Sequence, residues 1–287
     1  MNIKKLVLST SDVPEKLRNI SDPPKKLFVL SNDSKELLAR PAVAIVGSRK
    51  ATPYGTTITS NLAGDLARAG IVIVSGLAIG VDGIAHKAAL EAGGQVIAVL
   101  PCGLDRIYPA RHRDLAMQIL EQGGGLVTEY PEGTNIHKGN FIARNRIISG
   151  LSDAVLITEA VEKSGSLHTA DFALDQGRAV LAVPGNITSP TSRGTNNLIK
   201  SGAIPVTEVA DVLRSIGIEP LLAAKQPPAS SNPNEQVLID LLADGLQDGS
   251  ELLSRSQLDV SIFNQSLTML EIRGHIRPLG NNQWALQ

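Results

Sequence analysis

The feature that most constrains the fold is a series of short, unbroken apolar runs that begins at residue 43 and alternates with helical stretches. A strand with one wet face alternates polar and apolar residues, whereas an unbroken run is typical of a strand buried on both faces. The runs are VAIV (43–46), IVIVS (71–75), QVIAVL (95–100), GLVTE (125–129), AVLITE (154–159) and AVLAVPG (179–185). Strands that alternate with helices predict an α/β fold with a doubly wound, mostly parallel sheet, which binds ligands at the carboxyl ends of its strands.

The rest of the chain divides around this sheet domain, which we expect over residues 41–220. Residues 1–40 are short of apolar runs and hold the turn SDPP, so we expect an N-terminal lead-in packed on the sheet domain. Residues 221–233 lie in a stretch rich in Pro, Ser and Asn and predict a flexible linker. Residues 234–287 hold three helical patterns and then a hairpin pattern that turns at GNN, which indicates a small winged-helix-like domain.

Composition narrows the classes of function. The formal net charge is −1, so nucleic acid can be bound only through a local basic patch. The single cysteine, Cys102, excludes an intramolecular disulfide and a cysteine-rich zinc site and fits a reducing compartment. The sequence has no apolar stretch of signal-peptide or membrane-spanning length, so we expect a soluble cytoplasmic protein with no membrane partner. Aromatic residues make up only 3%, so any surface that stacks bases must be sparse.

The loops that follow the predicted strands carry the candidate binding residues. After the first strand, Gly47 permits a tight turn, Ser48 can donate a hydrogen bond, and Arg49 offers a planar guanidinium suited to phosphate. An ordinary strand-to-helix turn with a surface arginine explains this piece equally well. After the second strand, Ser75 and Gly76 bring backbone N–H groups close to a helix start.

Two further loops leave their interpretation open. Asp82 and His86 share a helix face, but the spacing of the other histidines supports no metal site, and an aspartate hydrogen-bonded locally at the helix start is favoured. The loop after the third strand carries Arg106, Arg111 and Arg113, with Tyr108 between them. It is either a basic loop with one stacking aromatic ring or a solvated surface loop.

The segment HKGNFIARNRIISG (137–150) predicts a helix that packs isoleucines on the sheet and begins at the ligand edge. Arg144 and Arg146 lie about 200° apart around such a helix, so both cannot face the same way. We expect one to point to the carboxyl edge of the sheet. The other pairs with an acid such as Glu129 or Asp153, or remains in solvent.

The last loops complete the pattern of small and basic residues. Ser164, Gly165 and Ser166 precede a helix, where backbone amides form an anion site. Asn196 opens the helix that follows the sixth strand, and Lys138 stands before the Arg-Asn-Arg segment. Several post-strand loops therefore bring small residues and cations to one edge, which predicts an anionic, phosphate-bearing ligand. Asn145 is interpreted as a local hydrogen-bonding residue that holds its turn.

These motifs resemble a known family. The segments VAIVGSRKATPYG, SGLAIGVDGIAH, FIARNRIISGLSDAVLITEA, SGSLHTA, AVPGN and SRGTNNLIKSGA are similar to those of the DNA-processing protein A family (DprA, also called Smf), in order over residues 13–210. The resemblance implies an extended Rossmann fold that binds single-stranded DNA, forms a homodimer, needs no cofactor, and helps to load RecA recombinase in natural transformation. It also implies that the Gly-Ser-Arg turn, the lysine and the Ser-Gly-Ser turn line a phosphate pocket.

The candidate residues fall into two sets. Those expected to contact DNA phosphate are Gly47, Ser48, Arg49, Lys138, Arg144, Asn145, Arg146, Gly165 and Ser166. Those expected along the path of the strand are Ser75, Gly76, Arg111, Arg113 and Asn196. The chain departs from the family at Ile142, where proline is usual, and at His168, where isoleucine is usual. Because the first core strand begins at residue 43, we also expect no helical N-terminal domain of the kind that many members carry.

The expected winged helix has the wrong charge for a DNA-binding module. Residues 233–287 hold three arginines and seven acidic residues, a net charge of −4. Duplex binding by such a module needs several phosphate contacts from lysine and arginine. We therefore expect this domain to serve protein contact or regulation and not to be the main DNA-binding surface.

Three classes of function remain. The first is a non-enzymatic, single-stranded DNA-binding recombination mediator. The second is a nucleotide glycosidic-bond hydrolase, for which Asp82, Glu129 and Glu159 near strand ends would supply a carboxylate. Against it, the turn is Ser-Gly-Ser, and no paired carboxylates follow it. The third is a dimeric scaffold that binds only proteins, which leaves the basic edge without a purpose.

Overall fold

The structure is a computed structural model, and it describes residues 4–219, 230–280 and 282–286. The chain forms two compact units, Met1–Glu219 and Pro220–Gln287. Most of the predicted linker, residues 221–229, and Asn281 of the predicted GNN turn lie outside the described residues. Within the described ranges, no helix has both the length and the apolar character needed to cross a membrane.

The first unit is built on a nine-stranded sheet with the order β1-β2-β6-β5-β4-β3-β7-β8-β9. The six predicted strands are all present as β3 (Ala42–Val46), β4 (Val72–Ser75), β5 (Val96–Val99), β6 (Gly125–Thr128), β7 (Ala154–Ile157) and β8 (Ala179–Ala182). Neighbours among them pair in parallel. From β3 the chain adds strands outward to β6 and then crosses to the other side of β3 to form β7. The predicted doubly wound, mostly parallel sheet is confirmed.

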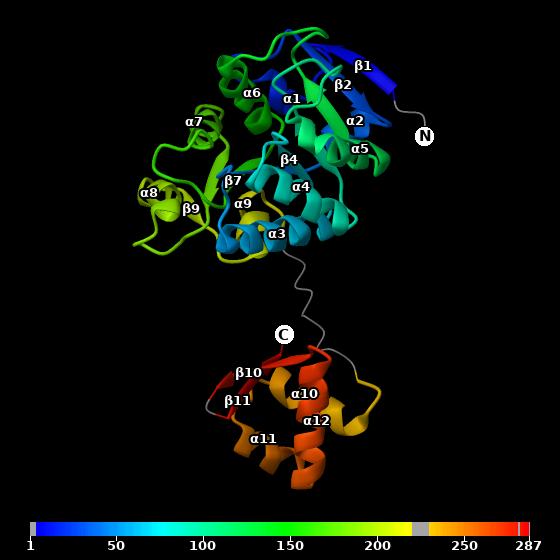
Figure 1. The fold of residues 1–287 in the computed structure, drawn as a ribbon, viewed down its shortest axis with the longest axis vertical. Coiled ribbons are helices and arrows are strands. Elements are labelled where there is room, and N and C mark those ends of the chain that lie inside the picture. The colour runs from blue at the N-terminus through cyan, green and yellow to red at the C-terminus, as the bar shows by residue number, and fades with distance from the viewer. Residues whose placement is uncertain (1–3, 220–229, 281, 287) are drawn as a thin grey trace. The chain divides into compact units, whose positions relative to one another are not determined.

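The sheet also contains three strands that the sequence pattern does not predict. β1 (Lys4–Ser9) and β2 (Lys26–Ser31) pair antiparallel, and β2 pairs antiparallel with β6. β9 (Ile204–Pro205) pairs in parallel with β8. The lead-in thus extends the sheet, and it adds the short helices α1 (Glu15–Arg18) and α2 (Ser34–Ala39). Figure 1 shows β1 and β2 at one end of the first unit and α8 (Arg193–Lys200) at the other.

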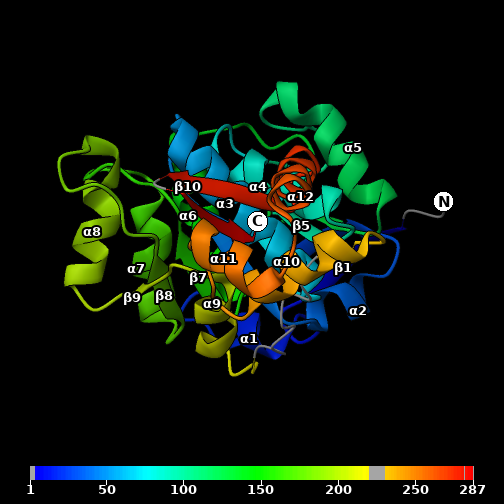
Figure 2. The ribbon, with the colours of Figure 1, turned by 90° about the horizontal axis from the view of Figure 1, so that it is seen from below.

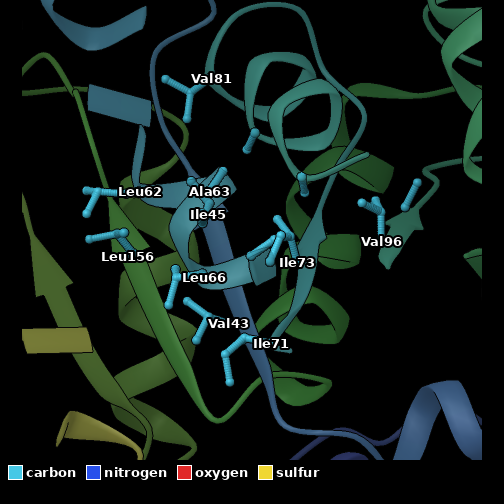
Figure 3. Packing of buried hydrophobic residues seen from close by; sticks show 14 of the residues in the cluster. Val43, Ile45, Leu62, Ala63, Leu66, Ile71, Ile73, Val81, Val96 and Leu156 are labelled. Atoms are coloured by element: carbon cyan, nitrogen blue, oxygen red, sulfur yellow. The ribbon is translucent and has the colours of Figure 1, made fainter. Parts of the chain in front are cut away.

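Helices cover both faces of the sheet. One face carries α3 (Pro53–Arg68), α4 (Val81–Glu91), α5 (Arg113–Glu121) and α9 (Val209–Ser215), and the other carries α1, α2, α6 (Lys138–Gly150) and α7 (Leu167–Asp175). Val43 and Ile45 of the central strand face the first layer, where Figure 3 shows them beside Leu62 and Leu66. Ala44 of the same strand faces the second layer. This burial on both faces explains why the core strands are unbroken apolar runs.

The second unit has the predicted order of three helices and a hairpin. Its helices are α10 (Pro233–Ala243), α11 (Gly249–Ser256) and α12 (Val260–Ile272), and its strands are β10 (Ile276–Gly280) and β11 (Gln283–Leu286). The two strands pair antiparallel. Figure 2 shows the three helices gathered beside β10. A small core that includes Leu238, Leu252 and Leu270 holds the unit together, and the arrangement is that of a winged helix.

Candidate phosphate-binding pocket at the strand ends

The loop after β3 turns tightly because its first residue has no side chain. A Cβ placed on Gly47 would lie 2.7 Å from the carbonyl oxygen of Glu159 and 2.8 Å from Cγ2 of Val81. The amide of Ser48 donates to that Glu159 oxygen over 2.8 Å, and the amide of Val81 donates to the carbonyl of Ser48 over 3.1 Å. The loop is therefore held between the end of β7 and the start of α4, and it leaves Arg49 exposed.

The carboxylate of Glu159 fixes the far end of the same loop. Its side chain is 2% exposed and accepts hydrogen bonds from the amide of Thr52, at 3.2 Å, and from the Thr52 hydroxyl. That hydroxyl in turn accepts from the amide of Gly55 over 3.1 Å and caps the N-terminus of α3. Glu159 therefore holds the helix start and the loop in one arrangement.

Arg144 lies beneath the pocket and is only 4% exposed. Its Nη1 donates to the carbonyl oxygen of Gly76 over 2.9 Å and to that of Val99, and its Nε donates to Oδ1 of Asn145 over 3.3 Å. Burial lowers the pKa of Arg144 to about 10, although nearby Asp82 opposes the shift. The guanidinium thus remains charged at neutral pH. It places a buried positive charge under the strand ends and ties β4 to β5.

Asp82 has the local role expected from its position at a helix start. Its Oδ2 accepts from the amides of Gly76, at 3.0 Å, and Ala78, at 3.3 Å. Burial raises the pKa of Asp82, while the charge of Arg144 and these hydrogen bonds lower it. Across residues 4–219, 230–280 and 282–286, no group of three or more His, Cys, Asp or Glu side chains is placed to hold a metal ion.

Arg146 points away from the pocket. Its Nη2 donates to Oε2 of Glu129 over 2.6 Å, and its Nε donates to Oδ2 of Asp22 over 2.8 Å. Pairing of one arginine with Glu129 is among the outcomes expected from the sequence. Arg146 is therefore separated from the other residues expected to contact phosphate, because it lies on the opposite side of α6 from the pocket.

The pocket itself has a volume of about 830 Å³ and gathers the loops after β3 and β7 around the start of α6. Four cationic side chains line it, namely Arg49, Lys50, Lys138 and Arg144, and the lining includes one acid, Asp82. Eight of the nine residues expected to contact phosphate lie together here, namely Gly47, Ser48, Arg49, Lys138, Arg144, Asn145, Gly165 and Ser166. Loops that are far apart in the sequence, between residues 47 and 166, thus meet to form one cationic surface.

An aromatic pair also lines the pocket; the sequence indicates Tyr108 as a candidate stacking ring, but not Phe141. The rings of Tyr108 and Phe141 meet edge to face, with centroids 5.3 Å apart and planes at 70°. Cζ of Arg49 lies 5.5 Å from the centroid of Phe141, within range of a cation–π contact. Tyr108 is 41% exposed. A signal for Phe141 was available, because it follows Lys138 by three residues and shares its helix face.

The residues expected along the strand's path are more scattered. Ser75 is buried and donates its hydroxyl to the carbonyl of Ile45 over 2.6 Å, and Gly76 lies against the guanidinium of Arg144. Asn196 holds Gly185 through hydrogen bonds of 3.0 and 3.2 Å to its backbone. These three are internal supports. Arg111 lines a neighbouring hollow, and Arg113 is exposed on α5.

Comparison with known proteins gives two family matches. A family described as DNA recombination-mediator protein A matches residues 4–217, and the DprA winged helix domain matches residues 222–282. Protein Smf of Escherichia coli K12 is 52% identical over 174 residues, which are 61% of this chain and 46% of that protein. This chain spans about half the length of the first curated relatives it matches.

Two solved structures are similar to this chain over about three quarters of its length. DNA processing protein A of Streptococcus pneumoniae is 41% identical, with a TM-score of 0.68 over 74% of each chain. The protein of the same name from Helicobacter pylori is 37% identical, with a TM-score of 0.66 over 75% of this chain and 96% of that one. The Helicobacter structure is described as showing a single-stranded DNA binding mode.

Proposed function

The chain belongs to the DNA recombination-mediator protein A family, and on that premise we propose that its pocket binds the backbone of single-stranded DNA. The observation that carries this proposal is the gathering of four cations around one concave surface at the carboxyl ends of the strands. Arg49, Lys50 and Lys138 are exposed and free to meet phosphates, and Arg144 adds its charge from below. The single-stranded DNA binding mode described for the Helicobacter relative supports the same ligand class.

The aromatic pair favours a single strand over a duplex. Base–aromatic stacking requires a base whose face is free, and a paired base inside a duplex has none to offer. The exposed ring of Tyr108 and the neighbouring ring of Phe141 provide such a platform at the edge of the cationic pocket. In this proposal phosphates meet Arg49, Lys50 and Lys138, while a base packs against the aromatic pair.

Further parts of the function rest on family membership. We propose that the protein protects incoming DNA and delivers the strand to RecA recombinase during natural transformation and homologous recombination. We also propose that it acts in the cytoplasm as a homodimer. The winged-helix part of the second unit, residues 233–287 with a net charge of −4, is assigned to protein contact or regulation.

The hydrolase alternative finds little support in the carboxylates that it would use. Glu159 is engaged by Thr52, Asp82 by the amides of Gly76 and Ala78, and Glu129 by Arg146. Each carboxylate thus already has a structural partner. Incubation with AMP followed by a search for free adenine separates the two functions, since release of the base would favour the enzyme.

The binding proposal is tested by removing one exposed cation at a time. We expect Arg49→Ala or Lys138→Ala to lower single-strand affinity roughly tenfold or more, because each removes a charge-assisted contact. The slope of log affinity against log salt should fall by about 0.7 for each lost phosphate contact. Arg68→Ala is the matched control, because Arg68 is exposed at the far end of α3 and pairs with Asp65.

Two results would contradict the pocket assignment. One is unchanged affinity in both pocket variants while circular dichroism shows them folded. The other is an equal loss in the Arg68 control. A gel shift that compares single-stranded with duplex DNA across salt tests the strand preference, and equal binding of both would remove the role given to the aromatic pair.

A further inference from the structure

A second hollow adjoins the pocket, and its charge is entirely positive. It has a volume of about 560 Å³, and its lining includes Arg49, Lys50, Lys87, Arg111 and His112 but no aspartate or glutamate. Arg49 and Lys50 line both this hollow and the phosphate pocket. The two cationic surfaces therefore meet at one pair of side chains.

The first turn of α4 forms the floor of the hollow, and two glycines shape it. Gly80 has a φ of +85°, and a Cβ placed on it would lie 2.7 Å from the carbonyl carbon of Arg49. A Cβ on Gly83 would lie 2.6 Å from Cε1 of His112. The ring of His112 is fixed by a contact of 2.9 Å between its Nδ1 and the carbonyl of Leu77. The floor thus touches the Arg49 loop on one side and the Arg111–His112 segment on the other.

We propose that this hollow continues the track of the single strand, so that phosphates passing Arg49 and Lys50 run on to Lys87 and Arg111. The inference rests on the proposed function, since it extends the same bound strand. It assigns the hollow a partner of one chemical class, the sugar-phosphate backbone of single-stranded nucleic acid.

The lining explains how the two parts of the track differ. The pocket carries Tyr108 and Phe141, whereas the lining of the hollow has no Phe, Tyr or Trp, and its single ring, His112, is held against the carbonyl of Leu77. The hollow therefore binds backbone and leaves the bases in solvent. Lys87 is available for this role, because its 3.6 Å pair with Glu91 joins side chains that are 70% and 66% exposed. Such a pair is weak in water and can yield to phosphate.

The test compares charge reversal at two exposed arginines. Arg111→Glu removes a cation from the hollow, and Arg68→Glu makes the same change in net charge at the far end of α3, outside the linings of both the hollow and the pocket. Affinity is measured for oligothymidylates of about 4 to about 16 nucleotides, the range that single-strand-binding modules cover. Arg49→Ala serves as a variant that weakens binding at every length.

We expect Arg111→Glu to bind the shortest strands as wild type does and the longest ones roughly tenfold more weakly, the value of one charge-assisted contact. Lys87→Ala, an independent variant, should lower the salt slope of long strands by about 0.7 and leave that of short strands unchanged. The inference is overturned if Arg111→Glu and Arg68→Glu behave alike at every length. If the wild-type protein binds no oligothymidylate of any length, the proposed function itself is wrong, and the inference that rests on it is wrong too.

Discussion

Replacement of Arg144 by methionine tests whether its buried guanidinium organises the pocket from below. Methionine keeps the length and the apolar stem of the side chain but removes every donor. The carbonyl oxygens of Gly76 and Val99, which follow β4 and close β5, then lose the donor that the structure gives them. We expect the first unit to lose stability and the pocket to lose its shape together.

The magnitude follows from the groups left without a partner. Each buried acceptor that loses its donor costs about 1–3 kcal/mol, so the two carbonyls together cost about 2–6 kcal/mol. Asp82 adds to this loss, because the charge of Arg144 stabilises its ionised form. The total free energy of unfolding of a domain of this kind is about 5–15 kcal/mol. Arg49→Met is the matched control, since Arg49 is exposed and its contact with Phe141 is worth about 0.5–1 kcal/mol.

The assay is urea unfolding read by hydrogen exchange in β4 and β5, which reports on the first unit and not on the winged helix. Arg144→Met should unfold at a clearly lower urea concentration than Arg49→Met, although both variants lose single-strand affinity. The reasoning is refuted if the two variants unfold at the same concentration. It is also refuted if Arg144→Met retains wild-type exchange in both strands.

Three other predictions concern His86, Gly47 and the second unit. Burial lowers the pKa of His86 from 6.5 to about 3. The free energy of unfolding should therefore be constant above pH 6.5 and fall by up to ~1.4 kcal/mol per pH unit between 6.5 and about 3. In thermal melts, His86→Leu should lose less stability than wild type as the pH falls. Gly47→Ala should cost about 1–3 kcal/mol in a urea titration, because its Cβ meets Glu159 and Val81, whereas Gly165→Ala has nothing within 4 Å and should melt like wild type. Deletion of residues 226–287 should leave single-strand affinity unchanged in a fluorescence titration, and a collapse of binding would contradict the role assigned to that unit.

The parallel core was predictable because strands that are buried on both faces are unbroken apolar runs in the sequence. Strands β3 to β8 are short apolar runs, and the structure contains all six. The three additional strands, β1, β2 and β9, are not unbroken runs of buried apolar residues. All but one residue of β1 are exposed, β2 buries only alternate residues, and both residues of β9 are exposed. Each forms a strand because the sheet edge offers it backbone partners, which a local pattern does not reveal.

The sequence was enough to predict at which edge of the sheet the site lies, but not which residues contact one another there. A doubly wound sheet brings the loops after its strands together, so the gathering of Ser48, Lys138 and Gly165 followed from topology. The contacts that shape the pocket join distant segments. Tyr108 meets Phe141 across 33 residues of sequence, and the pair of Arg146 with Asp22 spans 124 residues. No spacing rule within one helix or strand reports on such pairs.

The two arginines of the Arg-Asn-Arg segment of α6 stabilise the structure, whereas other, exposed cations are placed to contact a ligand. Arg144 and Arg146 are 4% and 8% exposed, and each donates to protein acceptors through two of its three guanidinium nitrogens. A buried guanidinium that already donates to protein groups gains less from a phosphate than an exposed one does, because a bond to the phosphate has to replace some of those contacts. Lys50 and Lys138 are exposed, and Arg49 is exposed with one contact to the ring of Phe141, so a phosphate displaces mainly water around these three cations. Arg146 ties α6 to the antiparallel lead-in. In the proposed complex, Arg144 therefore acts through its charge and through the loops it holds, and the exposed cations make the direct contacts with the strand.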